Sequence, residues 1–305
     1  MVYGTINMDL YAFINRMPYE GETLASNQYF ESPGGKALNQ AVTVARMGKS
    51  VSLIGKIGRD AYGAEIIEKL ISEGIRVDHI STNSNTHTGN SFVLIDGQGN
   101  NTIITNLGAN QCLSIKDVND SLTVAKNASV ALIQLEMPSN VRKHLIRQLN
   151  KLGIKIVLNL APIVELPIKI RRLVDILIVN EIEAEQLTGT IVHDSNTAEK
   201  AANILGEQGN QNVVITLGSN GAVVKEDNSV YVVDAPKVKV VDSTGAGDCF
   251  CGSLGSFLLE NDIKTAVEKA VKVAALSVTK SGTLYSIPSQ REVYTYLNEK
   301  GRLFK

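Results

Sequence analysis

The feature that most constrains the fold is an alternation of short apolar runs with helix-length amphipathic segments after residue 130. The predicted strands are 130–135, 154–158, 175–179 and 212–217, and the helices between them are 139–151, one ending near 187, and 197–208. Two short strands, 222–225 and 230–233, and two helices, 250–259 and 264–280, follow. Strands that alternate with helices form a parallel sheet with helices on its faces. The pattern predicts a three-layer α/β/α fold around a mostly parallel central sheet.

The first third of the chain interrupts this alternation. A strand at 2–6, a helix from Gly34 to Gly48, a strand at 51–56 and a helix at 61–73 fit the main sheet. Strands at 10–14 and 23–31, and a hairpin of 91–96 and 101–105 around a turn at 97–100, do not. We expect the segments 10–31 and 90–106 to form a small separate sheet within a single domain, 1–305, because no linker or repeat divides the chain.

The overall composition excludes several classes of protein. The 305 residues are 44% apolar and carry 30 basic against 31 acidic side chains, without a basic run, which argues against nucleic acid and anionic membranes as partners. No apolar run approaches the roughly 20 residues of a membrane-spanning helix. Three cysteines make an odd count, and an N-terminus with three early polar residues does not resemble a signal peptide. We therefore expect a cytoplasmic protein without a disulfide framework.

One stretch, 241–250, combines glycines with acidic side chains between an apolar run and a predicted helix. It reads Val-Asp-Ser-Thr-Gly-Ala-Gly-Asp-Cys-Phe. A glycine-rich helix start offers unpaired N–H groups and the positive end of the helix dipole to an anion such as phosphate. A carboxylate beside a phosphate is repelled unless it accepts a proton, so Asp248 is interpreted as a general base in a phosphoryl-transfer site. Taken alone, the same residues are better explained as a first-turn helix cap, Asp248, beside glycines that only shape a turn. The dinucleotide-binding fingerprint fails, because Phe250 stands where its third glycine belongs.

A second glycine-rich stretch, Pro33-Gly-Gly-Lys-Ala-Leu-Asn-Gln40, lies far upstream at another predicted helix start. Backbone amides with Lys36 and Asn39 suit the hydroxyls of a polyol, and the lysine suits developing negative charge. The spacing does not match a Walker A loop. Polar residues also follow five predicted strands: Asn7 and Asp9, Glu136, Asn180 and Glu183, Thr216 and Gly218, and Asp242 with Asp248. The carboxyl ends of parallel strands share one edge, so we expect these residues to converge.

Together these residues resemble the ribokinase-like (PfkB) family of carbohydrate kinases almost from end to end. The family's two signatures are similar to Asp242-Ser-Thr-Gly-Ala-Gly-Asp248 and to Pro33-Gly-Gly-Lys36 followed by Asn39-Gln-Ala41, and its magnesium and phosphate motif is similar to Asn180-Glu-Ile-Glu183. Within the family, the ribokinases are the best match. The segments that carry this finer likeness are Gly4-Thr-Ile-Asn-Met-Asp9, Gln134-Leu-Glu136, Asn159-Leu-Ala-Pro162, Ile215-Thr-Leu-Gly-Ser219 and Ser286-Ile-Pro288.

The resemblance implies an ATP-dependent sugar kinase, a phosphotransferase with an alcohol acceptor, which converts D-ribose to ribose 5-phosphate. It implies that Asp248 is the base and that Gly245, Ala246 and Gly247 form the anion hole. The implied sugar site is Asn7, Asp9, Gly34, Gly35, Lys36, Asn39 and Glu136. The resemblance places Asn180 and Glu183 near the triphosphate and Mg²⁺. It implies that the nucleotide site is lined by Thr216, Gly218, Ser219 and Gly221. The small sheet would be a lid that also mediates dimerisation.

The resemblance further implies a potassium ion held by Asp242. Its other ligands would be the carbonyls of Thr244, Val278, Ser281 and Thr283 and the hydroxyl of Ser286. The chain departs from the usual family pattern at three places: Ala37 replaces a glycine, Leu160 replaces a proline, and Leu284-Tyr285 precedes Ser286. The last departure bears on the cation site, because carbonyls of this loop are expected ligands.

Other functions remain open from the sequence. A kinase of the same family for fructose, deoxyribose or adenosine has the same motifs, although Asn7 and Asp9 favour a sugar with hydroxyls at both C2 and C3. A non-catalytic sugar- or nucleotide-binding regulator would share the fold, but it would not need Asp248. A dinucleotide-dependent oxidoreductase lacks its glycine fingerprint.

Overall fold

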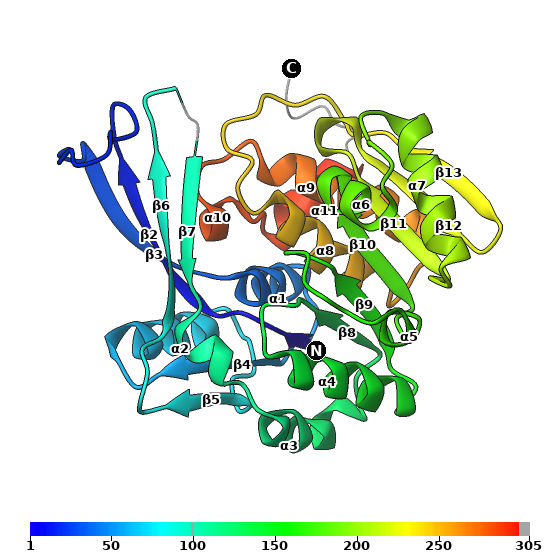
Figure 1. The fold of residues 1–305 in the computed structure, drawn as a ribbon, viewed down its shortest axis with the longest axis horizontal. Coiled ribbons are helices and arrows are strands. Elements are labelled where there is room, and N and C mark those ends of the chain that lie inside the picture. The colour runs from blue at the N-terminus through cyan, green and yellow to red at the C-terminus, as the bar shows by residue number, and fades with distance from the viewer. Residues whose placement is uncertain (99–100, 299–305) are drawn as a thin grey trace.

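The computed structural model describes residues 1–98 and 101–298, and it has the predicted three layers (Figure 1). The central sheet has nine strands. In spatial order they are β13 (Ser229–Val233), β12 (Ala222–Glu226), β11 (Asn212–Thr216), β10 (Ile176–Asn180), β9 (Lys155–Asn159), β8 (Val130–Ile133), β1 (Val2–Tyr3), β4 (Leu53–Gly58) and β5 (Ile80–Asn83). The pairs from β11 to β5 are parallel, whereas β12 and β13 form an antiparallel edge. The predicted α/β/α class is confirmed.

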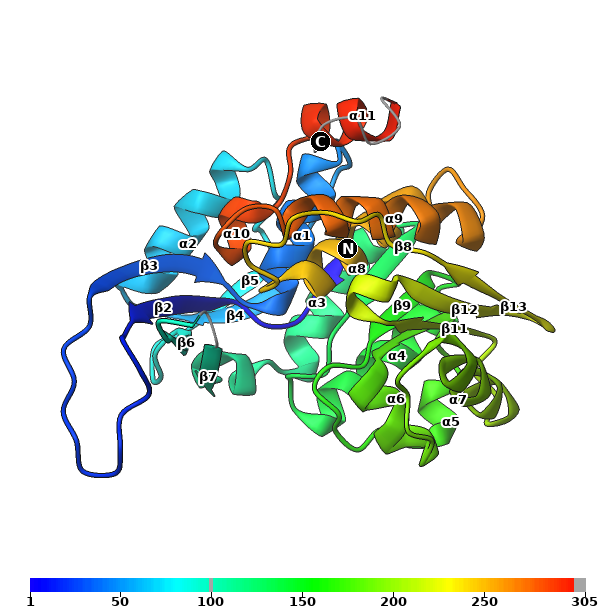
Figure 2. The same ribbon diagram turned by 90° about the horizontal axis from the view of Figure 1, so that it is seen from above.

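Two sets of helices cover the two faces of this sheet, as the view from above shows (Figure 2). One hydrophobic core contains residues of α1 (Lys36–Arg46), α2 (Ala61–Ser72), α8 (Ala246–Phe257) and α9 (Ile263–Ser277). The other contains residues of α3 (Ile115–Ala125), α4 (Ser139–Lys151), α5 (Ile168–Arg171), α6 (Glu181–Thr188) and α7 (Ser195–Glu207). Successive strand residues point to opposite faces, so Leu53 packs in the first core and Ile54 in the second.

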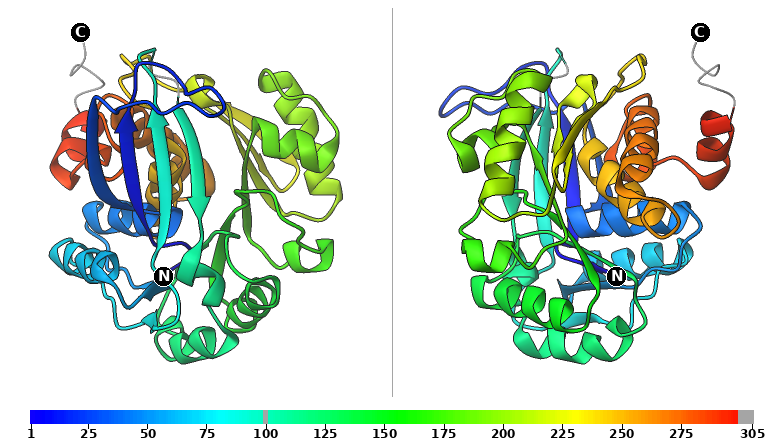
Figure 3. Two further views of the ribbon diagram at one scale, coloured as in Figure 1. Left: turned by 60° about the vertical axis from the view of Figure 1, so that its left-hand side comes forward. Right: turned by 90° about the vertical axis from the view of Figure 1, so that its right-hand side faces the viewer.

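A second sheet of four strands stands beside the main body (Figure 3). Its order is β3 (Gln28–Gly34), β2 (Asn7–Phe13), β6 (Gly89–Ile95) and β7 (Asn101–Asn106). The central pair, β2 and β6, is parallel, and the outer pairs are antiparallel. This sheet is the predicted lid. The predicted hairpin turn at 97–100 lies partly outside the described residues, because 99 and 100 are not among them.

Several predicted boundaries were wrong. The strand expected at 2–6 ends at Tyr3, and β2 begins at Asn7 instead of residue 10. The strand expected at 23–31 is β3, which begins at Gln28. β5, α3, α5, two 3-10 helices, η1 (Gly108–Cys112) and η2 (Gly218–Asn220), and two late helices, α10 (Thr283–Ser286) and α11 (Gln290–Asn298), were not predicted. The shortest of these segments take their conformation from packing. α3 and α11 do carry local signals, since α3 begins with a capping box at Ser114 and Asp117 and α11 buries Val293 and Tyr296 on one side.

The apolar run before Asp242 is not a strand, contrary to the prediction. Residues 234–241 leave the edge strand β13 without pairing, and the side chains of Val240 and Val241 are each 57% exposed. Val238 and Val240 line a cavity instead. The alternation of valines therefore reflects a pocket wall and not a pleated, half-buried surface.

Candidate active site

The helix start at Gly245 is built as the glycine pattern predicts. Gly245 is the N-cap of α8 and has φ of 78°, a left-handed conformation that favours glycine. The amide of Ala246 donates to the carbonyl oxygen of Ser243 (3.2 Å), so this amide is used within the turn. Gly247 is exposed, and a Cβ at this residue would meet no atom within 4 Å. The start of α8 thus faces open space where an anion has access to the first turn.

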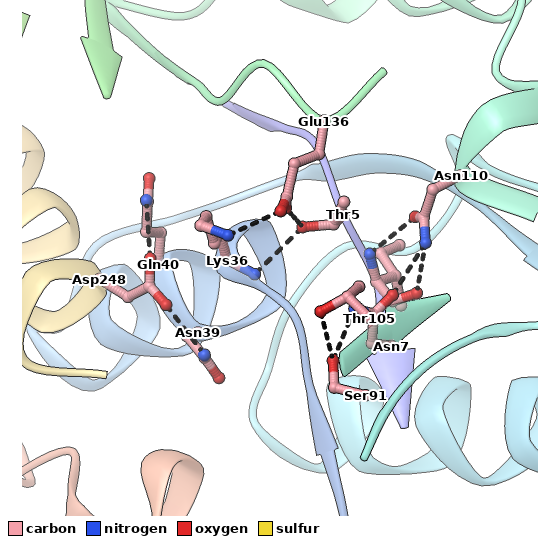
Figure 4. Close-up of polar contacts among 11 residues, drawn as sticks. Thr5, Asn7, Lys36, Asn39, Gln40, Ser91, Thr105, Asn110, Glu136 and Asp248 are labelled. Carbon is pink, nitrogen blue, oxygen red and sulfur yellow. Dashed lines mark hydrogen bonds and ion pairs between the residues drawn. The ribbon is translucent and has the colours of Figure 1, made fainter. Parts of the chain in front are cut away.

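Asp248, in the first turn of α8, is held by two amides from α1. Asn39 Nδ2 donates to Oδ2 (3.0 Å) and Gln40 Nε2 donates to Oδ1 (3.2 Å) (Figure 4). Gln134 Nε2 in turn donates to Gln40 Oε1 (2.6 Å), which orients the Gln40 amide. Burial raises the pKa of Asp248, while the ammonium of Lys36 opposes the shift. Each carboxylate oxygen keeps a lone pair, so the group is oriented and remains able to accept a proton.

Lys36 lies at the start of α1 and pairs with Glu136. The distance from Nζ to Glu136 Oε1 is 2.8 Å, and Thr5 Oγ1 donates to Oε2 (3.0 Å) while accepting from the Lys36 amide (3.2 Å) (Figure 4). Burial works against the charged form of Lys36, but Glu136 and Asp248 outweigh it, and its pKa is raised. The ammonium therefore stays charged and links the start of α1 to Glu136 on the segment after β8.

Asn7 and Asp9 lie on the lid strand β2, not at the end of β1 as predicted. Asn7 is buried and is fixed by Asn110, whose Nδ2 donates to Asn7 Oδ1 (2.8 Å), and by Ser91, which accepts from Asn7 Nδ2 (3.3 Å) (Figure 4). Asp9 is also buried, and burial raises its pKa to about 7, with Asp248 adding to the shift.

The glycine signature on β3 makes room for this carboxylate. β3 pairs with β2 so that Gly34 faces Asn7, and a Cβ at Gly34 would lie 1.9 Å from Asp9 Oδ2. Any side chain at Gly34 would therefore displace Asp9. Gly35, the N-cap of α1, lies against the backbone of Thr5 and Asn7. The two predicted glycines let the Lys36 helix start approach the strand that carries Asp9.

A cavity of about 580 Å³ opens on the other side of the α8 start. The four residues predicted for the nucleotide, Thr216, Gly218, Ser219 and Gly221, line it together with Ala246 and Gly247. Sequence reasoning missed the remaining wall, which is mostly apolar and comes from the segment after β13 and from α8 and α9: Ala235, Pro236, Lys237, Val238, Val240, Ser243, Phe250, Val271, Ala274, Ala275 and Val278. Apolar walls with a few polar groups at one end suit a nucleobase followed by its phosphates.

Asn180 and Glu183 do not line that cavity. They form a capping box at the start of α6: Asn180 Oδ1 accepts from the Glu183 amide, and Glu183 Oε2 accepts from the Asn180 amide, both at 2.8 Å. Burial raises the pKa of Glu183, and Lys36 is close enough to oppose that shift. Within residues 1–98 and 101–298, no group of three or more acidic, histidine or cysteine side chains is arranged to hold a metal ion.

Asp242 lies at the junction of two loops. Its Oδ1 accepts from the amide of Thr244 (2.9 Å) and its Oδ2 from the amide of Gly282 (3.0 Å). Two of the predicted cation ligands, Thr283 and Ser286, lie on α10, directly after Gly282. They contact each other, because Ser286 Oγ donates to the Thr283 carbonyl (3.0 Å). The carbonyl of Val278 accepts from two amides, those of Val241 and Asp242, which occupies both of its lone pairs. The structure therefore groups Asp242 with the 282–286 segment and uses Val278 as a turn acceptor.

Buried amide and hydroxyl groups complete the site, and sequence reasoning assigned them no role. They are Thr5, Gln40, Ser91, Asn110 and Gln134, each 6% exposed or less. Thr5, Gln40 and Gln134 belong to the family motifs given in the sequence analysis, and that membership is the signal that could have drawn attention to them. Asn110 carried no signal, because its partner Asn7 is more than 100 residues away in the chain.

Comparison with known proteins identifies the family of this chain. The model of the pfkB family of carbohydrate kinases matches residues 1–290. Ribokinase from Dictyostelium discoideum is 36% identical over 313 residues, which cover 96% of this chain and 98% of the relative. Deoxyribokinase from Salmonella typhi is 34% identical over 300 residues, with 97% and 98% covered.

Solved structures agree in fold. The structure of Arabidopsis thaliana ribokinase complexed with ribose and ATP has a TM-score of 0.89 at 28% identity and 97% coverage of both chains. That of Thermotoga maritima ribokinase has a TM-score of 0.88 at 32% identity, with 97% of this chain and 98% of the other covered. Because the family model and the relatives extend over nearly the whole chain, this chain belongs to the pfkB family of carbohydrate kinases, phosphotransferases with an alcohol group as acceptor.

Proposed function

We propose that the chain is an ATP-dependent ribokinase, which transfers the γ-phosphoryl group of ATP to the 5-hydroxyl of D-ribose. The observation that carries the proposal is the position of Asp248. It stands at the start of α8, between the polar cluster of Lys36, Asp9 and Asn7 and the apolar cavity of about 580 Å³. This arrangement provides a sugar site and a nucleotide site on the two sides of one carboxylate, and the ribokinase relatives support the same reading.

The proposed chemistry requires little of the protein beyond orientation and charge. Asp248 accepts the proton of the sugar hydroxyl as the hydroxyl oxygen attacks the γ-phosphorus, and the bond from that phosphorus to the leaving ADP oxygen breaks. The backbone of Gly245, Ala246 and Gly247 is proposed to meet the transferring group, with the Ala246 amide shared between that group and the Ser243 carbonyl. Lys36 adds positive charge near Asp248. On the sugar side, Asn7, Asp9, Gly34, Gly35, Asn39 and Glu136 hold the hydroxyl groups, and Thr216, Gly218, Ser219 and Gly221 line the nucleotide side.

Mg²⁺ is proposed to enter with the triphosphate, whose charge it neutralises. Asn180 and Glu183 would approach it through water, because their side chains already cap α6. The lack of a three-ligand cluster in the described residues fits this assignment, since Mg²⁺ keeps several waters and is bound by phosphates with one or two carboxylates.

A potassium ion beside Asp242 is proposed as a second cofactor. One carboxylate, the carbonyls of Thr244, Ser281 and Thr283 and the Ser286 hydroxyl form a set of hard oxygen donors, and such donors suit a hard cation. Each oxygen of Asp242 accepts one hydrogen bond from an amide and keeps a further lone pair with which it can bind the cation. The ion would order the loop before α8 and would not contact the substrate.

The experiment that tests the function is a coupled assay of ADP production over a panel of pentoses, hexoses and nucleosides. We expect D-ribose to have the highest kcat/KM. A preference for 2-deoxyribose would instead favour the second candidate, a deoxyribokinase, which is supported by the 34% identity to such an enzyme. If none of the sugars or nucleosides in the panel is phosphorylated, the kinase proposal itself is overturned.

A homodimer formed through the lid and a cytoplasmic location complete the proposal. The outer face of the lid exposes Phe92 and Ile104, which lie opposite each other on β6 and β7 and are 47% and 62% exposed. A small sheet with an apolar outer face is marginal alone, and pairing two copies would cover it. No helix among the described residues is long and apolar enough to cross a membrane.

A further inference from the structure

Tyr11 joins the lid to the loop region beside α8 through one buried hydrogen bond. It lies two residues after Asp9 on β2, so both side chains point to the inner face of the lid. The Tyr11 hydroxyl is 2.7 Å from Thr283 Oγ1, and the two residues are 2% and 6% exposed. The ring stacks on Phe30 of β3, with centroids 4.5 Å apart and planes 11° apart. Burial raises the pKa of Tyr11 to about 12, so the hydroxyl stays protonated at working pH.

Thr283 in turn lies directly against the start of α8. A Cβ built on Gly245 would be 2.4 Å from Thr283 Cγ2, so the threonine methyl group fills the space beside the N-cap glycine. The residue before it, Gly282, donates its amide to Asp242. The other end of α10 is tied down by Arg46, whose Nη1 donates to the carbonyls of Leu284 (3.1 Å) and Ile287 (2.7 Å). Thr283 thus lies between the start of α8, against which its methyl group packs, and the lid, from which the Tyr11 hydroxyl reaches its side chain.

We propose that Tyr11 is a positioning residue for phosphoryl transfer, which acts through Thr283 to hold Gly245 and the first turn of α8 where their amides meet the transferring group. The proposal rests on the kinase function proposed above. Because Asp9 lies on the same face of the same strand, the bond also sets the spacing between the proposed sugar site and the anion hole. The amides that Tyr11 positions act on the transferring group in the transition state, and Tyr11 itself does not contact the substrate, so its effect should fall on kcat and not on substrate affinity.

The test is a double-mutant cycle of Tyr11→Phe and Thr283→Val, in which each variant removes the hydrogen bond and keeps the shape. We expect each single variant to lower kcat about fivefold, the factor that the net worth of one hydrogen bond corresponds to. KM for the sugar and for ATP should stay within about twofold of the wild-type values. The double variant should lose no more than either single variant, because both changes delete the same bond.

Tyr3→Phe is the matched control. Tyr3 is fully buried on β1, and its hydroxyl pairs with Ser121 Oγ at 3.1 Å, away from the site. It should lower the melting temperature about as much as Tyr11→Phe and leave kcat unchanged. The inference is overturned if Tyr11→Phe keeps the kcat of Tyr3→Phe, if the two single effects multiply in the double variant, or if only the KM for the sugar changes. An inactive wild type would instead overturn the proposed function.

Discussion

At the scale of single residues, the site depends on which carboxylate takes the proton. Asp248 is the only carboxylate of the proposed site in the first turn of α8, and two amides already orient it. Glu136 is paired with the ammonium of Lys36 and with Thr5, and it lies on the segment after β8 instead of at the start of α8. The geometry therefore favours Asp248 as the proposed base and Glu136 as a proposed sugar-binding residue.

Replacing Asp248 with Asn should lower kcat by about 10²–10⁴, because the change keeps the shape and removes the proton acceptor. Sugar affinity, measured by calorimetry without ATP, should be largely kept. Asp262→Asn is the control, since Asp262 caps α9 by accepting from the Thr265 amide (2.7 Å) and lies outside the site. A variant that retained more than about a tenth of the wild-type kcat would remove Asp248 from the role of base.

Sugar binding should strengthen as pH rises through about 7. Burial raises the pKa of Asp9 to about 7 in the sugar-free protein, so the carboxyl is largely protonated below that pH. A carboxylate that accepts hydrogen bonds from sugar hydroxyls must be ionised. The Kd for ribose should therefore rise up to about tenfold for each pH unit below about 7.

The raised pKa of Asp9 has the opposite effect on the free energy of unfolding, which falls as pH rises while ribose binding strengthens. The folded-state pKa of Asp9 lies above its unfolded value of 3.8, so the protonated form favours folding and this contribution is lost as pH rises from about 4 through about 7.

Calorimetry with Asp9→Asn should show weak ribose binding that no longer varies with pH across this range. A wild-type Kd that is constant from about pH 6 to about pH 8 would contradict the assignment.

At the scale of elements, the start of α8 is supported by neighbours that lie far from it in the chain. Asn39 and Gln40 come from α1, Thr283 from α10, and Gln134 follows β8. The two glycine-rich helix starts, of α1 and α8, are thereby joined through Asp248. The loop before α8 is anchored separately, by the two hydrogen bonds that Asp242 accepts from the amides of Thr244 and Gly282.

Potassium should raise kcat several-fold at constant ionic strength, when KCl replaces tetramethylammonium chloride with Mg-ATP and sugar saturating. The physical reason is that a cation held beside Asp242 would order the loop that presents the α8 amides. Asp242→Ala should abolish the response, whereas Asp78→Ala, a change of an exposed aspartate after α2, should leave it intact. Equal rates in the two salts would mean that Asp242 only caps the turn.

At the scale of the whole molecule, the lid is a sheet whose two faces have different tasks. The inner face carries Asp9, Tyr11 and Ser91, and the outer face carries Phe92 and Ile104. Strands β2 and β3 are joined by a long loop that extends from the body in the view from above (Figure 2). With Asp9 and Ser91 on the face toward the site and with Phe92 and Ile104 exposed on the other face, the sheet is suited to the proposed roles of binding substrate on one side and a second copy on the other.

Light scattering at micromolar concentration should therefore give the mass of a dimer. Ile104→Asp should shift the protein to monomer, because a charge directly opposite Phe92 is costly to bury in an interface. Ile191→Asp is the matched control, since Ile191 is as exposed (67%) but lies in the segment between α6 and α7. A monomeric wild type with full activity would contradict the lid interface.

The sequence alone determined the architecture of the main sheet and the two glycine-rich helix starts. Both are local properties: a strand or an amphipathic helix shows its own periodicity, and a helix start shows its own glycines and caps. For that reason β8 to β13, α4 and α6 to α9 were found close to their true bounds. The family signatures identified Asp248, Lys36 and Asp9 for the same reason, since each lies inside a short motif.

Only the tertiary structure decided how those motifs are held in place. Asn110 fixes Asn7, Gln134 orients Gln40, and Tyr11 meets Thr283 across 272 positions of the chain. Val238 and Val240, before Asp242, line a cavity together with residues of α9 instead of forming a strand, because β13 already ends the sheet. Such contacts join residues that are distant in sequence, and no local periodicity records a partner that folding alone brings near.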